Sequence, residues 1–462
     1  MNTLRTQIIV NKKLISRSLV GSFALATLML VSGPANAADS YFDTNGSTAG
    51  SGVIGGTTYN TWTTLSDWST SSAGTAATST WTADDDAIFS AGTDADALGY
   101  GISISAGSTV VNSISKNGSG NVAITGSGTM SLTSGTFNVA GGNLSMNMIV
   151  TGTSGITKNG AGGLGFGAGA ATYTGDTVVN AGILSMSAAR HPVTSRLVLN
   201  NSGVFRSFAG FNTVAGISGT STSTFVENGF GGLGATITTS KASGEESYAG
   251  TVRDTGAAVA IIKDGAFTQR FSGDNTYTGL TTVTAGTLLI NGDSSSATGA
   301  VTVESAGTLG GTGTVGGSTT LDGGGSLSAG DSSRAILTFS NGLDISAVDG
   351  TPSLLFSLGT TGDSDRIASG ALTIGTGVLG FDDFSFAAET GFGAGVYTLF
   401  ASSGITGSLD GSDLTGLVGG LSSSLSLSGS DVLLTVVPEP ATGGLLLLGL
   451  GLVFGVRSHR KR

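Results

Sequence analysis

The chain has 462 residues, of which 79 are glycine and only 11% are charged, and its formal net charge is −11. It contains no cysteine, which excludes disulfides, thiolate metal sites and a cysteine nucleophile. Eight of its 19 lysines and arginines lie in the two terminal segments, so acidic residues dominate the rest. A body of this charge would repel phosphates, and nucleic acid is therefore not an expected partner.

The first 37 residues have the pattern of a secretory signal. A mostly apolar stretch, 19–31, follows the basic residues Arg5, Lys12, Lys13 and Arg17. Ala35 and Ala37 then form a small-x-small site before Ala38, the arrangement that a signal peptidase cleaves. The sequence therefore predicts a signal peptide over 1–37 and a mature chain that begins near Ala38. An uncleaved membrane anchor is the alternative.

The next segment, 38–100, is richer in aromatic residues than the rest. It contains all three tryptophans, Trp62, Trp68 and Trp81. We expect a β cap here, because large aromatic side chains can cover the unpaired strands at the end of a stack. The acidic run 84–86 has ligand types that suit calcium, although a solvated turn before a strand is the simpler interpretation.

The composition of the middle of the chain favours short strands joined by tight turns. The chain is 39% hydrophobic, and only Pro192 and Pro352 of its five prolines lie outside the terminal segments. Glycine supplies positive φ at turns, whereas proline removes a donor from a sheet ladder. Apolar residues alternate with a period of two at Leu184 and Met186, at Leu288 and Ile290, and at Val301 and Val303. This period indicates strands with one buried face.

One sequence pattern occurs at least twice. The better-defined copy has a box formed by Lys263, Gly265, Asn275, Thr276, Tyr277, Thr278, Gly279 and Gly286. A second copy starts at Lys158, and a fainter one starts at Lys116. A unit of this size cannot bury its apolar face alone, so neighbouring units must stack. The repeats therefore predict a parallel β-solenoid in which Asn, Ser and Thr form ladders between turns.

These copies resemble the autotransporter-associated β-strand repeat of passenger domains. The Lys158 copy departs from that pattern before Tyr173, and Phe267 stands where a second glycine is usual. The resemblance implies an all-β, right-handed parallel β-helix. We expect this solenoid over 101–345, followed by a C-terminal β region over 346–435.

The last segment, 436–462, combines three features in order. Pro438, Glu439 and Pro440 precede an apolar stretch, 443–456, which is followed by the basic residues Arg457, Arg460, Lys461 and Arg462. The apolar stretch predicts a transmembrane helix of about 21 Å, shorter than the roughly 30 Å hydrocarbon core. The terminal basic residues should stay in the cytoplasm and act as a membrane stop.

This combination resembles the PEP-CTERM sorting signal of Gram-negative bacteria. The resemblance implies that an exosortase-type protease of the inner membrane processes the tail, and that the protein accompanies exopolysaccharide. An ordinary tail anchor is the alternative.

The body contains few residues suited to catalysis. His191 is its single histidine, which argues against a Ser-His-Asp triad and a histidine-clustered zinc site. Asp363 and Asp365, beside Arg366, are the carboxylates that a β-helix enzyme acting on polysaccharides would use, but a surface loop with a salt bridge is the simpler interpretation. No catalytic, cofactor-binding or metal residues are predicted.

The sequence thus predicts an exported, non-enzymatic structural or interaction protein of the cell surface or extracellular matrix, associated with exopolysaccharide or biofilm. Its expected partners are a signal peptidase, an exosortase-like membrane protease and exopolysaccharide. The C-terminal helix should tether it to the inner membrane before processing. An adhesin that binds cells or surfaces and a polysaccharide-active β-helix enzyme are the alternatives.

Overall fold

The computed structural model describes residues 37–59, 62–105, 107–167, 169, 171–187, 191–208, 210–229 and 232–438, all within one compact unit, Ala37–Arg462. The described residues form strands and a single 3₁₀ turn, η1 (Phe381–Asp383), with no α-helix. None of them lies in a helix long and apolar enough to cross a membrane. The predicted signal segment up to residue 36 and the tail beyond Pro438 lie outside the described residues.

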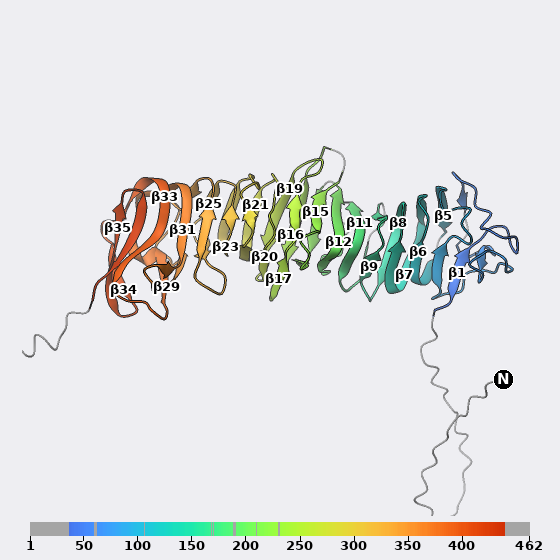
Figure 1. Cartoon of the computed structure of the whole chain (residues 1–462), viewed down its shortest axis with the longest axis horizontal. Coiled ribbons are helices and arrows are strands. Elements are labelled where there is room, and N and C mark those ends of the chain that lie inside the picture. Colours follow the sequence, from blue (N-terminus) through green and yellow to red (C-terminus); the bar gives the residue numbers. More distant parts are fainter. Residues whose placement is uncertain are drawn as a thin grey trace, which may run out of the picture. The chain divides into compact units, whose positions relative to one another are not determined.

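Successive strands follow one another along the body in chain order, from β1 in blue to β36 in red (Figure 1). The strands of the N-terminal half are β1 (Asp39–Phe42), β2 (Thr58–Tyr59), β3 (Trp68–Ser69), β4 (Asp86–Phe89), β5 (Tyr100–Ile104), β6 (Ser108–Lys116), β7 (Val122–Val139), β8 (Asn143–Gly152), β9 (Ile156–Asn159), β10 (Gly163–Phe166), β11 (Thr177–Ser187), β12 (Leu197–Phe208), β13 (Gly210–Val214), β14 (Ile217–Ser218), β15 (Phe225–Asn228), β16 (Ala235–Ser240), β17 (Glu245–Tyr248) and β18 (Thr251–Arg253). Those of the C-terminal half are β19 (Val259–Asp264), β20 (Thr268–Phe271), β21 (Thr281–Ile290), β22 (Asp293–Ser294), β23 (Val301–Gly311), β24 (Thr314–Val315), β25 (Thr319–Leu321), β26 (Ser326–Ala329), β27 (Ile336–Phe339), β28 (Leu343–Asp344), β29 (Leu354–Thr360), β30 (Asp363–Ser364), β31 (Arg366–Leu379), β32 (Phe384–Ala388), β33 (Gly395–Leu409), β34 (Thr415–Val418), β35 (Leu421–Ser428) and β36 (Asp431–Val436).

The strands pair mainly in parallel with the strand one turn away along the chain. Phe137 of β7 lies opposite Lys158 of β9, which lies opposite Val179 of β11, which in turn lies opposite Leu199 of β12. Parallel pairing between consecutive turns is the pattern of a β-solenoid. The predicted all-β solenoid is therefore confirmed.

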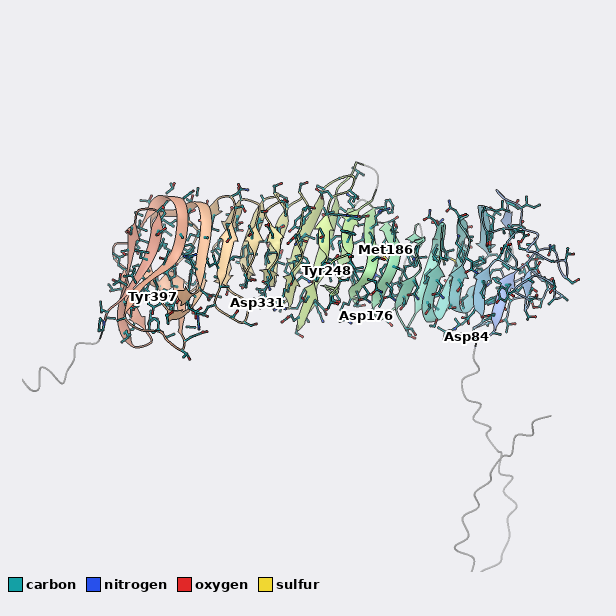
Figure 2. All side chains as sticks on the ribbon, viewed as in Figure 1. Asp84, Asp176, Met186, Tyr248, Asp331 and Tyr397 are labelled. Atoms are coloured by element: carbon teal, nitrogen blue, oxygen red, sulfur yellow. The ribbon has the colours of Figure 1, made fainter. Side chains whose placement is uncertain are left out.

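The interior of the coil is a continuous apolar core. One column runs in register through six strands, from β8 to β18, and consists of Leu144, Leu164, Leu184, Phe205, Val226 and Val252. All six side chains are buried, as are the six alternating residues that the period of two marked as inward-facing. In Figure 2, Met186 and Tyr248 lie within the stack of strands, whereas the acidic residues Asp84 and Asp176 lie along its margin.

Both ends of the described body depart from the simple parallel coil. At the N-terminal end the three tryptophans pack together: the ring centroids of Trp62 and Trp68 are 5.0 Å apart, and those of Trp68 and Trp81 are 4.6 Å apart. Phe42 and Phe89 pack against this cluster. At the C-terminal end, β33, β34, β35 and β36 pair in antiparallel fashion, so the chain reverses direction instead of starting another turn.

Candidate functional site

The lysine that opens the repeat box lies inside the coil. Lys263 is fully buried in β19, and its Nζ donates hydrogen bonds to the carbonyl oxygens of Gly265 and Ala285, each at 2.8 Å. A longer bond of 3.2 Å reaches the carbonyl of Asp264. Ala285 belongs to β21, which pairs in parallel with β19. The ammonium group therefore ties two consecutive turns together.

The other two copies use the same contact. Lys158 Nζ donates to the carbonyls of Gly160 at 2.7 Å and of Ala181, one turn on, at 3.1 Å. Lys116 likewise bonds to the glycine two positions on and to the following turn, at 2.6 and 2.7 Å. Burial lowers the pKa of all three lysines, to about 8 for Lys158 and Lys263. Carbonyl oxygens around the amine favour its charged form, so it acts as a donor at neutral pH.

Two glycines of the box make this contact sterically feasible. Gly265 and Gly286 have φ values of +73° and +66°, and a Cβ at Gly286 would lie 2.3 Å from the carbonyl oxygen of Gly265. Only glycine avoids both the strain and this collision. Phe267, which replaces a usual glycine, places its ring centroid 4.1 Å from Lys263 Nζ and covers the buried charge.

The remaining residues of the box join neighbouring turns. Asn275 is fully buried. Its side-chain oxygen accepts a hydrogen bond from a backbone N–H of the preceding turn, and its side-chain nitrogen donates one to a serine hydroxyl of the following turn. Thr276 and Gly279 donate their amide N–H groups to earlier turns. The hydroxyl of Tyr277 lies 2.8 Å from that of a buried threonine, and Thr278 donates to the carboxylate of Asp254. The box is therefore a set of structural contacts.

An asparagine ladder runs along the outside of the coil. Asn159 donates to Asn138 at 3.0 Å, Asn180 donates to Asn159 at 2.8 Å, and Asn200 donates to Asn180 at 3.0 Å. The ladder begins at Ser115, which accepts a bond from Asn138. Ladders of this kind were predicted from the stacking of repeats.

A second ladder consists of charged residues. Glu227 of β15 is fully buried and lies in register between Arg206 of β12 and Arg253 of β18. Each arginine donates two hydrogen bonds to one carboxylate oxygen, at 2.6–2.9 Å. No motif predicted this triad. Its three members are 21 and 26 residues apart, close to the length of one turn, and that spacing was the available signal.

His191, weighed as a catalytic base, and Asp86 of the acidic run have structural partners. His191 is buried, its Nδ1 lies 3.0 Å from the carbonyl of Pro192, and burial lowers its pKa to about 4. Asp86 accepts bonds from Asn112 and Ser113. Within the described ranges, no group of three or more histidine and acidic side chains is placed to hold a metal ion.

Asp363 and Asp365 do not act as a pair. Asp363 is exposed and forms an ion pair with Arg334 at 2.5 Å, which lowers the pKa of this carboxyl. Asp365 is buried and accepts backbone N–H groups at 2.7 and 2.9 Å, while burial raises its pKa. The loop does carry a salt bridge, but its cation, Arg334, lies 29 residues earlier in the chain. Local sequence spacing therefore did not reveal it.

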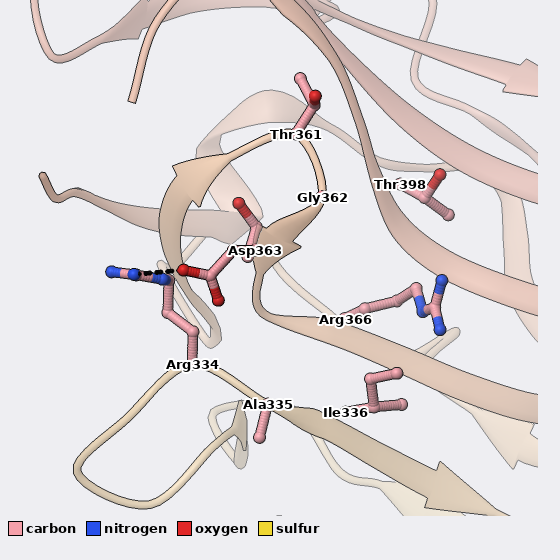
Figure 3. Close-up of a pocket in the computed structure, with 9 residues that line it drawn as sticks. Arg334, Ala335, Ile336, Thr361, Gly362, Asp363, Arg366 and Thr398 are labelled. Carbon is pink, nitrogen blue, oxygen red and sulfur yellow. Dashed lines mark hydrogen bonds and ion pairs between the residues drawn. The ribbon is translucent and has the colours of Figure 1, made fainter. Parts of the chain in front are cut away.

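A cavity of about 310 Å³ lies beside this loop (Figure 3). On one side, Ile336 of β27 and Arg366 of β31 occupy neighbouring positions in register, and Thr398 of β33 lies beside Arg366. The other side is the hairpin between β29 and β30, with Thr361 and Asp363. Arg334 also pairs with Glu389, and these ion pairs fix the hairpin over the sheet.

The chain was also compared with known proteins. Residues 156–186, 261–290 and 285–310 match the passenger-associated-transport-repeat, and residues 436–461 match the PEP-CTERM protein-sorting motif. Both resemblances are confirmed. The chain is also 30% identical over 293 residues to the adhesin BmaC autotransporter of Brucella suis biovar 1 (strain 1330), a match that covers 61% of this chain and 8% of that protein. The chain thus spans less than a tenth of this relative.

The matches fit the geometry of the repeat box. Lys158 and Lys263 lie within the first two matched repeats, and the third begins at Ala285, which accepts the hydrogen bond from Lys263. The PEP-CTERM motif indicates an exported surface protein that an exosortase-type membrane protease processes. Of its Pro-Glu-Pro box, only Pro438 lies within the described residues.

Proposed function

We propose that the chain is a structural protein of the cell surface or extracellular matrix and that it is associated with exopolysaccharide or biofilm. The observation that supports this most strongly is the PEP-CTERM motif at residues 436–461, joined to a solenoid whose repeat lysines bind its own backbone. A coil held together by such contacts between turns is a stable scaffold whose outer faces remain free for interaction.

Its delivery would follow from the two ends of the chain. A signal peptidase removes residues 1–37 before Ala38, and the helix 443–456 holds the protein in the inner membrane with its basic stop in the cytoplasm. An exosortase-type protease then cuts near the Pro-Glu-Pro box, 438–440. The exported body consists of the cap 38–100, the right-handed repeat solenoid 101–345 and the C-terminal region 346–435.

An adhesin that binds cells or surfaces is the second candidate. The relative from Brucella suis is an adhesin, which favours this role, and the match covers 8% of that protein. An enzyme that acts on polysaccharides has less support, because Asp363 and Asp365 have separate partners.

Terminal-peptide mass spectrometry on envelope and extracellular fractions tests the delivery. We expect a chain that starts near Ala38 and ends near Pro440 outside the cell. A full-length chain retained in the inner membrane would contradict the proposal.

A deletion strain tests the matrix role, and purified protein tests adhesion. We expect the deletion to reduce matrix retention and cell aggregation, and unchanged matrix would argue against the proposal. Binding of the purified protein to cells or beads that lack polysaccharide would instead favour the adhesin.

A further inference from the structure

The cavity beside the β29–β30 hairpin contains a guanidinium group whose charge is not matched. Arg366 belongs to no ion pair among the residues that the structure describes, and its Nε is buried without a hydrogen-bond partner. The other arginines of the described body each pair with at least one carboxylate: Arg196, Arg206, Arg253, Arg270 and Arg334. Arg366 is therefore the exception.

A buried donor without an acceptor is unfavourable, by about 1–3 kcal/mol. The residue opposite Arg366 on the neighbouring strand does not relieve this cost, because it is the apolar Ile336, which offers no acceptor. Arg366 does line the cavity, so a ligand there can supply the anionic partner that its guanidinium lacks. A guanidinium binds carboxylates well, since it can donate two parallel N–H···O bonds.

The rest of the cavity lining suits hydroxyl groups. Figure 3 shows Arg366 and Thr398 on one side of the cavity and the Arg334–Asp363 ion pair on the other, with Thr361 above them. Threonine hydroxyls can donate or accept, and a carboxylate accepts from hydroxyls. Ile336, which is 39% exposed, offers an apolar surface to the face of a ring.

We propose that this cavity binds a carboxylate-bearing sugar unit, a uronic acid, within an acidic polysaccharide. The carboxylate would pair with Arg366, and the ring hydroxyls would bond to Asp363 and the threonines. Its volume, about 310 Å³, is at the lower end of the roughly 300–1,000 Å³ typical of small-molecule sites, so it fits a short stretch of sugar chain. This inference rests on the proposed function and names the class of polymer.

The nearby acidic groups distinguish this ligand from a compact anion such as phosphate. Asp363 and Glu389 flank Arg334, so the cavity has no large excess of positive charge. A uronic acid unit brings one carboxylate and several hydroxyls to this cavity and so matches both its cation and its carboxylate, whereas phosphate would concentrate its charge on one group beside Asp363 and Glu389.

The test is calorimetric titration of the full-length protein in detergent with three probes: a trimer of galacturonic acid, the same trimer with its carboxyls reduced, and free galacturonate. We expect the trimer to bind and both other probes to bind at least about 10-fold more weakly. Arg366→Gln should weaken trimer binding by about 10-fold, because it removes a charge-assisted contact. Arg366→Lys should recover part of the affinity.

Arg196→Gln is the matched control, since it removes the same charge at a distant ion pair and should leave trimer binding unchanged. Thr398→Val, expected to weaken binding about three-fold, provides a second variant if Arg366→Gln unfolds at a lower temperature than the wild type. Equal binding of the acidic and reduced trimers, wild-type affinity in Arg366→Gln, or no binding of the trimer would each overturn the proposal. Equal affinity for free galacturonate would overturn the polysaccharide part.

These outcomes are separable from the proposed function. A matrix unchanged by deletion would refute the matrix role even if the trimer binds the purified protein. Loss of matrix on deletion, combined with no trimer binding, would refute the uronic acid site alone.

Discussion

Replacing Lys263 by methionine tests the role assigned to the repeat lysine. The side chains have similar length, so the change removes the charge and the three donors while keeping most of the apolar volume. The carbonyls of Gly265 and Ala285 then lose donors at 2.8 Å. We expect the free energy of unfolding to fall at pH 7.

The magnitude follows from two opposing terms. Two hydrogen bonds from a charged donor contribute about 1.5–3 kcal/mol each, or roughly 3–6 kcal/mol together. Burial of the ammonium opposes them, because lowering the pKa of Lys263 from 10.5 to about 8 corresponds to roughly 3 kcal/mol. The difference is about 0–3 kcal/mol, and the two carbonyls left buried without a donor add to it, so the expected net loss is at least about 1 kcal/mol.

The same pKa predicts how the effect depends on pH. Below pH 8 the lysine is protonated in both the folded and the unfolded protein. Between pH 8 and 10.5 the unfolded chain binds more protons, so the stability of the wild type rises with pH relative to the variant. With a folded pKa of about 8, the gain is about 2 kcal/mol by pH 9.5.

Urea unfolding at pH 7.0 and 9.5 measures both quantities, and hydrogen exchange at pH 7.0 locates the loss in β19 and β21. Thr282→Met, on the outer face of β21, is the control and should show no such dependence on pH. Lys158→Met should behave like the Lys263 variant. A difference between wild type and Lys263→Met that is equal at both pH values, or a variant as stable as the wild type at pH 7.0, would refute this reasoning.

Three further changes test the contacts that hold the coil together. Glu227→Gln leaves two arginines beside a neutral buried group and should lower the free energy of unfolding in urea by about 3–5 kcal/mol. A loss below about 1 kcal/mol would contradict the stabilising role of the triad. Gly286→Ala should cost at least about 2 kcal/mol because of its φ of +66°, whereas Gly165→Ala, which has open space around it, should change stability by less than about 0.5 kcal/mol. The pKa of His191 is lowered to about 4, so on acidification the histidine is protonated in the unfolded chain before it is protonated in the folded protein. The free energy of unfolding of the wild type should therefore fall by about 2–3 kcal/mol between pH 7 and 4.5. That of His191→Phe should fall by less.

The sequence by itself was sufficient for the class of fold and for the PEP-CTERM sorting motif. Alternation at Leu288 and Ile290 and glycine at turns indicate short strands, and a repeat too small to bury its own face must stack on its neighbours. The sorting motif could be identified because its three parts are contiguous and local.

The tertiary structure alone decided which side chains meet across turns. The partners of Glu227 lie 21 and 26 residues away, and that of Asp363 lies 29 residues away. Because the length of a turn varies along the coil, spacing in the sequence does not specify the register in which strands pair. Lys263 shows the same limit: the repeat marks its position, but lysine is rarely buried, and only the folded coil shows that carbonyls of its own turn and of the next turn surround its ammonium group.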